Sequence, residues 1–458
     1  MRLGALTTAS GSSPSPSPSP SGARAASQVD LGLDDWSSRW FSAARACLVC
    51  LLLAAPLAFG AVAPWAWAAV IGLVVLALFC WAAGCVRVHT IAVAWTPLYV
   101  PALLFLVLAA GQLLSGHTAD PIGTRDSILL YGAYVLLFGL ATTLSATTQR
   151  HWSSLAKIVT GYTLLLSLFA ILQFFASPGR IYWSVVPRWG GYIFGPYVNH
   201  NHYAGLMEML VALTATFWLG RRRRDLWNWL AGFATLIALA SVALSGSRAG
   251  VASVLVEMLL LGAVALLAQR RGQLDSPVPA LALALLCATL IAAWLSPPET
   301  TERFRPAANA HDASFSDRVS MAADSLRIFR AHPFTGVGLG GFETAYPPFQ
   351  SVADDKRVDH AHNDYAEALA ETGTAGGILV FAALALFLVQ ARRNFRASLK
   401  PASDTIAWLR LGATIGCLGL LVHSYFDFNL HIPANAAWLT VCAALAVAPI
   451  RPLSFRTE

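Results

Sequence analysis

Long apolar runs recur along most of this chain, and they leave few folds open to it. Each run has about 18 or more residues, enough for a helix to cross a hydrocarbon core roughly 30 Å thick. The runs are continuous, whereas the strands of a membrane barrel alternate apolar and polar residues. Only 12% of the residues are charged, against about 25% in a soluble domain. We therefore predict an all-α, polytopic membrane protein.

The apolar runs predict about twelve transmembrane helices. Their expected limits are 43–62, 64–86, 93–114, 127–146, 155–176, 203–220, 226–244, 249–268, 278–295, 376–391, 405–424 and 435–450. Residues 1–42 form a Ser/Pro-rich tail, which cannot bury a core and is expected to be disordered. The first span is then an uncleaved anchor.

Lysines and arginines in the short loops set the orientation of these spans. They cluster at 221–224, 270–271 and 392–400. With nine spans in residues 43–295 and three in 376–450, all three clusters fall on one side. That side is the cytoplasm, and it also holds the two tails, 1–42 and 451–458.

Residues 296–375 then form a large loop outside the cytoplasm, between the ninth and tenth spans. They hold half of the chain's 24 acidic residues, and loops this long are uncommon without a function. An amphipathic helix is expected to open at Asp317-Arg318, with an apolar stripe of Val319, Ala322, Leu326 and Phe329. A second outer segment, 177–202, lies on the same face.

The end of the large loop carries a titratable group at the expected membrane boundary. His362-Asn363 is followed by nine residues and then by Gly373-Thr-Ala-Gly376. An ionisable residue in such a place is a candidate for function. If 360–373 is a helix, His362 faces the membrane domain, while Asp364, Glu367 and Glu371 face water. The alternative is that His362 only caps or packs this helix.

Four polar residues stand in a row before the sixth span: Asn199, His200, Asn201 and His202. Burying them without partners would cost several kcal/mol in total. We therefore expect them to face water, partners or a ligand. A hydrated loop without further function is the alternative.

Two arginines stand beside small or acidic neighbours on the outer face. Arg248 follows Ser247 between the seventh and eighth spans, and Arg318 follows Asp317 in the large loop. The guanidinium group suits a phosphate or pyrophosphate, because its planar fork donates two hydrogen bonds and keeps its charge. A snorkelling or salt-bridged arginine is the alternative for both.

Three other patterns are weaker. Gly336-Val-Gly-Leu-Gly-Gly341 spells a dinucleotide motif, but no βαβ unit surrounds it, so a turn that brings the backbone close to a ligand or to the bundle is favoured. Asp359, His360 and His362 lack the second spaced pair of a metal site, and no metal is predicted. His423, Asp427 and His431 would share one helical face, where they either orient a site residue or serve as structural polar groups.

Taken together, these motifs resemble a known family. The pattern His362-Asn363-x9-Gly373-x2-Gly376 is similar to the signature of the O-antigen ligase and polymerase superfamily. The order of the other motifs fits too: Asn199 to His202, Ser247-Arg248, Asp317-Arg318, Pro333 to Phe342, and His423 to Asn435. The resemblance covers most of residues 155–445 and leaves out the Ser/Pro-rich tail.

The resemblance implies a multi-pass glycosyltransferase of the bacterial inner membrane with its active site facing the periplasm. Such proteins move a glycan from undecaprenyl pyrophosphate to lipid A-core, in ligases, or to another lipid-linked repeat unit, in polymerases. The signature does not choose between the two. The family reaction is inverting and metal-independent and needs no cofactor. The implied partners are the lipid bilayer and other proteins of polysaccharide assembly, with no nucleic acid.

Within this framework each candidate residue has a role. His362 is the expected general base, because a histidine titrates near neutral pH. Arg248 and Arg318 are expected to bind the pyrophosphate. The sugar or phosphate pocket is expected to be lined by Asn199, His200, His202 and Asn363. A transporter or flippase for a lipid-linked glycan is the competing function, but transporters place their charges near the bilayer midplane.

Overall fold

The computed structural model describes residues 35–91, 93–145, 149–177, 179–187, 192–220, 225–270, 315–351, 358–398 and 405–449. Over these ranges the chain is helical, and its only β structure is two isolated bridges. The expected span 278–295, the tail 451–458 and most of the Ser/Pro-rich tail lie outside the described residues.

The apolar runs form helices, as the sequence predicts. They are α1 (Asp35–Leu57), α2 (Pro64–Arg87), α3 (Tyr99–Leu114), α4 (Pro121–Ser145), α5 (Gln149–Ala176), α6 (His200–Gly220), α7 (Leu226–Ser245), α8 (Arg248–Arg270), α13 (Asp364–Ser398), α14 (Thr405–His423) and α15 (Pro433–Val447). In the part of the chain that the structure describes, nine of these are long and apolar enough to cross a membrane, and α3 and α15 are shorter. The prediction of an all-α polytopic membrane protein is confirmed, while the count of twelve stays a prediction.

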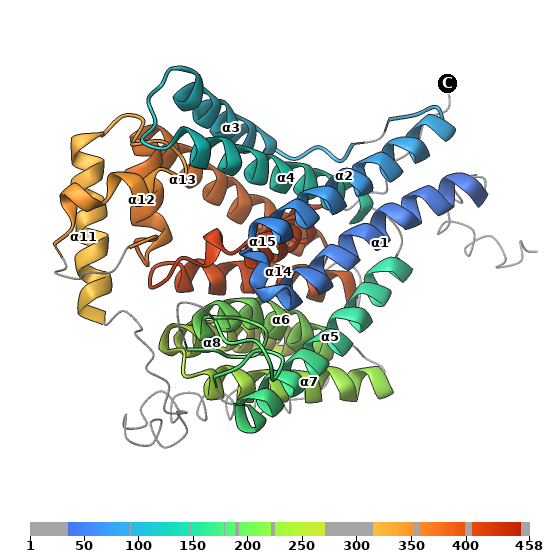
Figure 1. The fold of residues 1–458 in the computed structure, drawn as a ribbon. Coiled ribbons are helices and arrows are strands. Elements are labelled where there is room, and N and C mark those ends of the chain that lie inside the picture. Colours follow the sequence, from blue (N-terminus) through green and yellow to red (C-terminus); the bar gives the residue numbers. More distant parts are fainter. Residues whose placement is uncertain are drawn as a thin grey trace, which may run out of the picture.

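Helix α6 forms the centre of the bundle. Almost all of its apolar stretch is buried, and it packs against α5, α7, α8, α14 and α15. In Figure 1, α14 and α15 lie between the N-terminal helices α1 to α4 and the group α5 to α8. A helix buried on all sides is found at the centre of a bundle. Polar residues on α6 therefore have protein, and not lipid, around them.

Two helices of the large loop lie at one end of the bundle, α11 (Phe315–Ala331) and α12 (Phe342–Ala345) (Figure 1). Helix α11 packs on α13, but not by the predicted stripe, because Val319 and Leu326 are exposed. Its buried face consists of Met321, Asp324, Ser325 and Ile328. Asp324 can be buried because it accepts hydrogen bonds from the Tyr346 hydroxyl and from the backbone and hydroxyl of Ser351.

Helix α13 is broken at Gly373, where φ is 62° and ψ is −160°. Only glycine adopts this conformation readily. The break leaves backbone groups unpaired within the helix, and the glycine-rich segment 333–341 pairs with them. Backbone N–H groups of Val337 and Gly338 donate to Ala370 and Glu371, and those of Thr374 and Ala375 donate to Pro333 and Phe334.

The GxGxxG spelling therefore has a structural explanation. A Cβ on Gly336 would lie 2.2 Å from the carbonyl carbon of Glu371, so the backbones touch there. Gln112 of α3 joins them, because its Nε2 donates to the carbonyls of Thr335 and Glu371. The close approach is to the helical bundle, one of the two options that the sequence left open.

Replacing Gly373 with alanine is expected to destabilise the protein. The new Cβ would lie 2.5 Å from the carbonyl carbon of Phe334, and the backbone conformation itself costs about 1–3 kcal/mol for any other residue. We expect a lower unfolding temperature in detergent and lower abundance in membranes. In the control, Gly262→Ala on α8, the added methyl group meets open space, so equal losses in both variants would contradict this account.

Candidate functional site

Several helix ends meet at one place and bring polar side chains together. The backbone N–H of Asp364, at the start of α13, donates to the carbonyl of Ser424, just after α14. The amide of Asn435, on α15, donates to the carbonyl of His202, on α6. Segments that are far apart in the sequence are thereby fixed side by side, and the candidate residues can be located relative to one another.

Asp427 lies at the centre of this meeting point, in the turn after α14, and it is fully buried. Its Oδ1 accepts hydrogen bonds from the backbone of Phe428, at 2.9 Å, and from Nδ1 of His362, at 3.1 Å. Nε2 of His202 lies 3.8 Å from the same oxygen, and Nη1 of Arg318 lies 3.8 Å from Oδ2. Burial would raise the pKa of Asp427, but His202 and His362 hold this pKa well below its usual range.

His362 is held in a strained backbone conformation, with φ of 47°. Such strain at a non-glycine residue persists only where the surroundings impose it, and it is common at functional sites. An ionised carboxylate only accepts hydrogen bonds, so Nδ1 of His362 must donate to Asp427. A neutral imidazole then carries its lone pair on Nε2. With its side chain 15% exposed, His362 is equipped to take a proton from a bound molecule.

Asn363 has a clear structural task. Its Oδ1 accepts hydrogen bonds from the backbone N–H groups of Tyr365 and Ala366, and its Nδ2 donates to the carbonyl of Tyr425. This is the N-cap of α13. The cap starts the helix at Asp364, immediately after His362, and so positions the histidine. A role for Asn363 in substrate binding stays a prediction.

The predicted helix over 360–373 was wrong in where it starts and in which way it faces. Helix α13 begins at Asp364, inside the expected loop, and Asp364, Glu367 and Glu371 are buried, not turned to water. Each acid has donors from another segment. Glu371, for example, accepts from the backbone N–H of Phe342. These partners come from distant parts of the chain, so helical periodicity did not reveal them.

The four polar residues before the sixth span were expected to face water, partners or a ligand. His200, Asn201 and His202 are buried, which rules out a hydrated loop. Asn199 accepts from the backbone of Asn201, and Nδ1 of His200 lies 2.9 Å from the carbonyl of Ser245. Of the four, His202 is the one that the structure brings to Asp427.

The two arginines lie in different surroundings. Arg318, in the first turn of α11, donates to the carbonyl of Phe426 at 3.0 Å and is partly exposed beside Asp427. Arg248 is the first residue of α8 and is exposed. It follows the turn that contacts His200, but it is not among the residues around Asp427. The structure therefore brings His362, Arg318 and His202 together around Asp427, and Arg248 lies outside this group.

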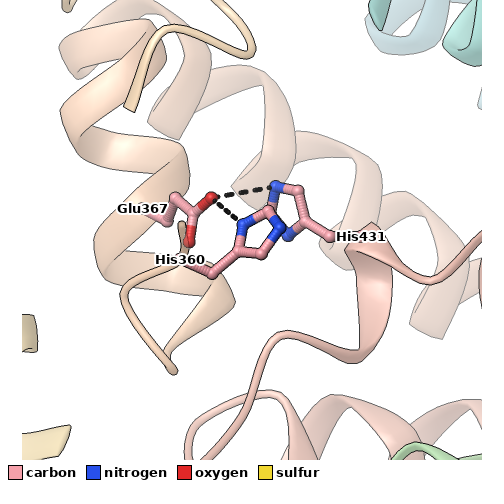
Figure 2. A group of neighbouring side chains, drawn as sticks. All are labelled: His360, Glu367 and His431. Atoms are coloured by element: carbon pink, nitrogen blue, oxygen red, sulfur yellow. Dashed lines mark hydrogen bonds and ion pairs between the residues drawn. The ribbon is translucent and has the colours of Figure 1, made fainter. Parts of the chain in front are cut away.

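A second group, the His360 cluster, consists of His360, Glu367 and His431 (Figure 2), together with Asp364, which contacts His431. Nδ1 of His360 lies 2.7 Å from Oε1 of Glu367, and Nε2 of His431 lies 3.3 Å from the same oxygen. Nδ1 of His431 donates to Asp364 at 2.9 Å. Although burial opposes it, Glu367 raises the pKa of His360, and Glu367 and Asp364 raise that of His431 to about 10.

Phe428 joins the two groups. Its ring stacks on His360 at 4.4 Å between centroids, and it meets His202 and His362 edge-on at 4.7 and 4.9 Å. Sequence analysis named Glu367 only as a residue turned to water, and it predicted neither a role for Phe428 nor the pairing of His360 with His431. The sequence does place Phe428 directly after Asp427, and that adjacency was the one available signal.

Residues 233–381 match the model of the O-antigen ligase family. Over these residues the chain is similar to that family. The match runs from α7 into α13 and includes Arg248, Arg318, His360 and His362, whereas Asp427 and His431 lie beyond it. The resemblance to the O-antigen ligase and polymerase superfamily is confirmed, and with its many apolar helices the chain is a multi-pass bacterial membrane protein. No curated protein matches the chain.

Proposed function

We propose that this protein transfers an oligosaccharide or polysaccharide from undecaprenyl pyrophosphate to an acceptor on the periplasmic face of the inner membrane. The observation that carries the proposal is the hydrogen bond from His362 to buried Asp427, with Arg318 beside them. An oriented base beside a cation is what the proposed reaction needs. The match of residues 233–381 to the O-antigen ligase family supports a glycan-transferring enzyme.

The reaction is a single displacement. Nε2 of His362 takes the proton from an acceptor hydroxyl while the hydroxyl oxygen attacks the anomeric carbon of the donor sugar. The bond from that carbon to the pyrophosphate oxygen breaks, and its electron pair leaves with the pyrophosphate. One displacement inverts the anomeric configuration. Asp427 keeps the imidazole in the required tautomer and stabilises the imidazolium that forms.

Guanidinium groups balance the charge of the leaving pyrophosphate. Arg318 lies next to the proposed base, and Arg248, exposed at the start of α8, is the second proposed partner of the pyrophosphate. Fixed cations in a partly dry site stabilise charge that develops in the transition state. His202 stands behind Asp427, where it supports the carboxylate. No metal ion and no cofactor take part in this chemical step.

Transport of a lipid-linked glycan is the second candidate, and one observation favours it. Within the helical bundle, Glu208 of α6 lies 2.6 Å from His423, and Glu257 of α8 is fully buried. Ionisable groups inside a membrane often line transport pathways. However, His362 and His431, at the helix ends, are partly exposed beside their carboxylate partners, whereas the His423–Glu208 pair is fully buried.

The experiment that separates the two functions uses purified protein in proteoliposomes with a fluorescent undecaprenyl pyrophosphate glycan as donor. A transferase forms a new glycosidic bond, which is read as a larger glycan on a gel or by mass spectrometry. A flippase moves the intact donor to the other leaflet, where an impermeant quencher reaches it. Donor movement without any new glycosidic bond would reject the proposed function.

Replacing Arg318 or Arg248 with lysine is expected to lower the rate of transfer by about tenfold or more. A point charge replaces a planar fork that donates two hydrogen bonds to the pyrophosphate. The rate is measured with purified variants at saturating acceptor. The control is Arg125→Lys, because Arg125 pairs on the surface with its neighbour Asp126. Wild-type rates in both test variants would show that bidentate contact with the pyrophosphate is unnecessary.

A further inference from the structure

We propose that His360, Glu367 and His431 bind one divalent transition-metal ion, with zinc as the preferred ion. Each of them offers one ligand atom, and the three atoms lie within 4.8 Å of one another. Two imidazoles and one carboxylate are a common zinc ligand set in proteins. The proposal goes beyond glycan transfer, because binding is measured without any substrate.

The geometry of the ligand atoms suits one ion. In Figure 2 the rings of His360 and His431 both turn toward the carboxylate of Glu367. Zinc binds nitrogen and oxygen at about 2.0–2.2 Å, so ligand atoms around it lie on the order of 3–3.5 Å apart. The separations from Oε1 of Glu367 to the two nitrogens are 2.7 and 3.3 Å. Small side-chain rotations are therefore enough to admit an ion.

The residues behind the ligands support this assignment. A metal-binding histidine generally donates its other N–H to a carboxylate or carbonyl group, which fixes the ring. Nδ1 of His431 makes such a bond to Asp364, and Asp364 in turn accepts from the backbone of Leu430. The second carboxylate oxygen of Glu367 accepts from the backbone of Ala361 at 2.8 Å. Both carboxylates are thus held in place before an ion arrives.

Charge and access also fit a cation. Asp364 and Glu367 are almost fully buried, and a divalent ion would balance two carboxylates. His360 and His431 are 27% and 20% exposed, which leaves a way in from the side of the site.

The bound ion would serve as a positioning device. It would tie together the segment before His362, the first turn of α13, and the short helix η4 (Asn429–His431) that follows Asp427. These are the segments that set the distance between His362 and Asp427. The ion would therefore stabilise the arrangement of the site without entering the chemical step.

Metal binding is tested on purified full-length protein in detergent after treatment with a chelator. Calorimetric titration with Zn²⁺ is expected to show one tight site per chain, and Co²⁺ is expected to give visible d–d absorption. The Glu367→Gln and His431→Gln variants should lose both signals. Asp364→Asn should bind about 10–100-fold more weakly, because it alters the support of a ligand. His332→Ala, an exposed histidine outside the cluster, is the control.

A second measurement uses only the wild-type protein, so its result does not depend on whether a variant folds. Zn²⁺ should raise the unfolding temperature of the chelated wild-type protein, and Mg²⁺ at the same concentration should not. Absence of stoichiometric Zn²⁺ binding by the wild type would overturn the proposal, as would wild-type affinity in Glu367→Gln. In either case the cluster is a network of hydrogen bonds and ion pairs, with His431 as a cation between Asp364 and Glu367.

Discussion

Replacing His362 with alanine is expected to remove glycan transfer while the protein stays inserted and abundant. The variant loses the group that we propose takes the proton of the acceptor, and general-base catalysis contributes about 10²–10⁴-fold in rate. The side chain is partly exposed and adjoins a helix that Asn363 caps on its own, so the loss of packing is small. The measurement is the initial rate of transfer by purified protein in proteoliposomes.

The matched control is His117→Ala, since His117 is an exposed histidine whose side chain hydrogen-bonds Ser115 and lies outside the site. It should transfer glycan at the wild-type rate. Wild-type transfer by His362→Ala would remove histidine from the mechanism, whatever the stability of the variant.

Replacing Asp427 with asparagine is expected to lower kcat by about a hundredfold or more. The new side chain has nearly the same shape, and its amide oxygen can still accept from Phe428 and His362. Its negative charge is lost, however, so the imidazolium that forms on His362 is no longer stabilised. The KM for the donor should stay close to its wild-type value, because Asp427 is buried and does not touch the glycan.

The split between kcat and KM separates this positioning role from a purely structural one. Asp324 gives the comparison, because it is also fully buried and also accepts several hydrogen bonds, but it lies on α11 away from His362. Asp324→Asn should lower the unfolding temperature and leave kcat of the folded fraction unchanged. If Asp427→Asn behaves in the same way, Asp427 supports the fold and does not orient the base.

The membrane helices could be predicted from the sequence because each one is a continuous apolar run. Every expected span except 278–295, which lies outside the described residues, coincides with a helix. Their ends were predicted less well. The expected span 376–391 is part of α13, which starts at Asp364, because Asn363 caps it there and Gly373 interrupts it without ending it.

The contacts of the site were harder to predict, because they join segments that periodicity treats separately. His423, Asp427 and His431 were expected on one helical face, yet α14 ends at His423 and the other two lie in the turn and in η4. One of the two options for these residues was that they orient a site residue, and Asp427 does contact His362. The sequence alone could not show which of the three would do so.

The His360 cluster illustrates the same limit. From the sequence, Asp359, His360 and His362 lacked the second pair of ligands that a metal site needs. In the fold, the partners of His360 come from later in the chain. Glu367 lies in the first turn of α13, and His431 lies after α14. The residues next to each other in sequence do not form the cluster, because His362 contacts Asp427 whereas His360 contacts Glu367.

The proposed function requires the site to face outside the cytoplasm, since the proposed acceptor is periplasmic. Helix α8 offers a direct test, because Arg248 and Arg270 are exposed at its two ends. A membrane-impermeant thiol reagent on intact spheroplasts should label the Arg248→Cys variant above the parent protein. The Arg270→Cys variant should be labelled only after lysis. Labelling in the opposite order would put the His362 group on the cytoplasmic side and contradict periplasmic glycan transfer.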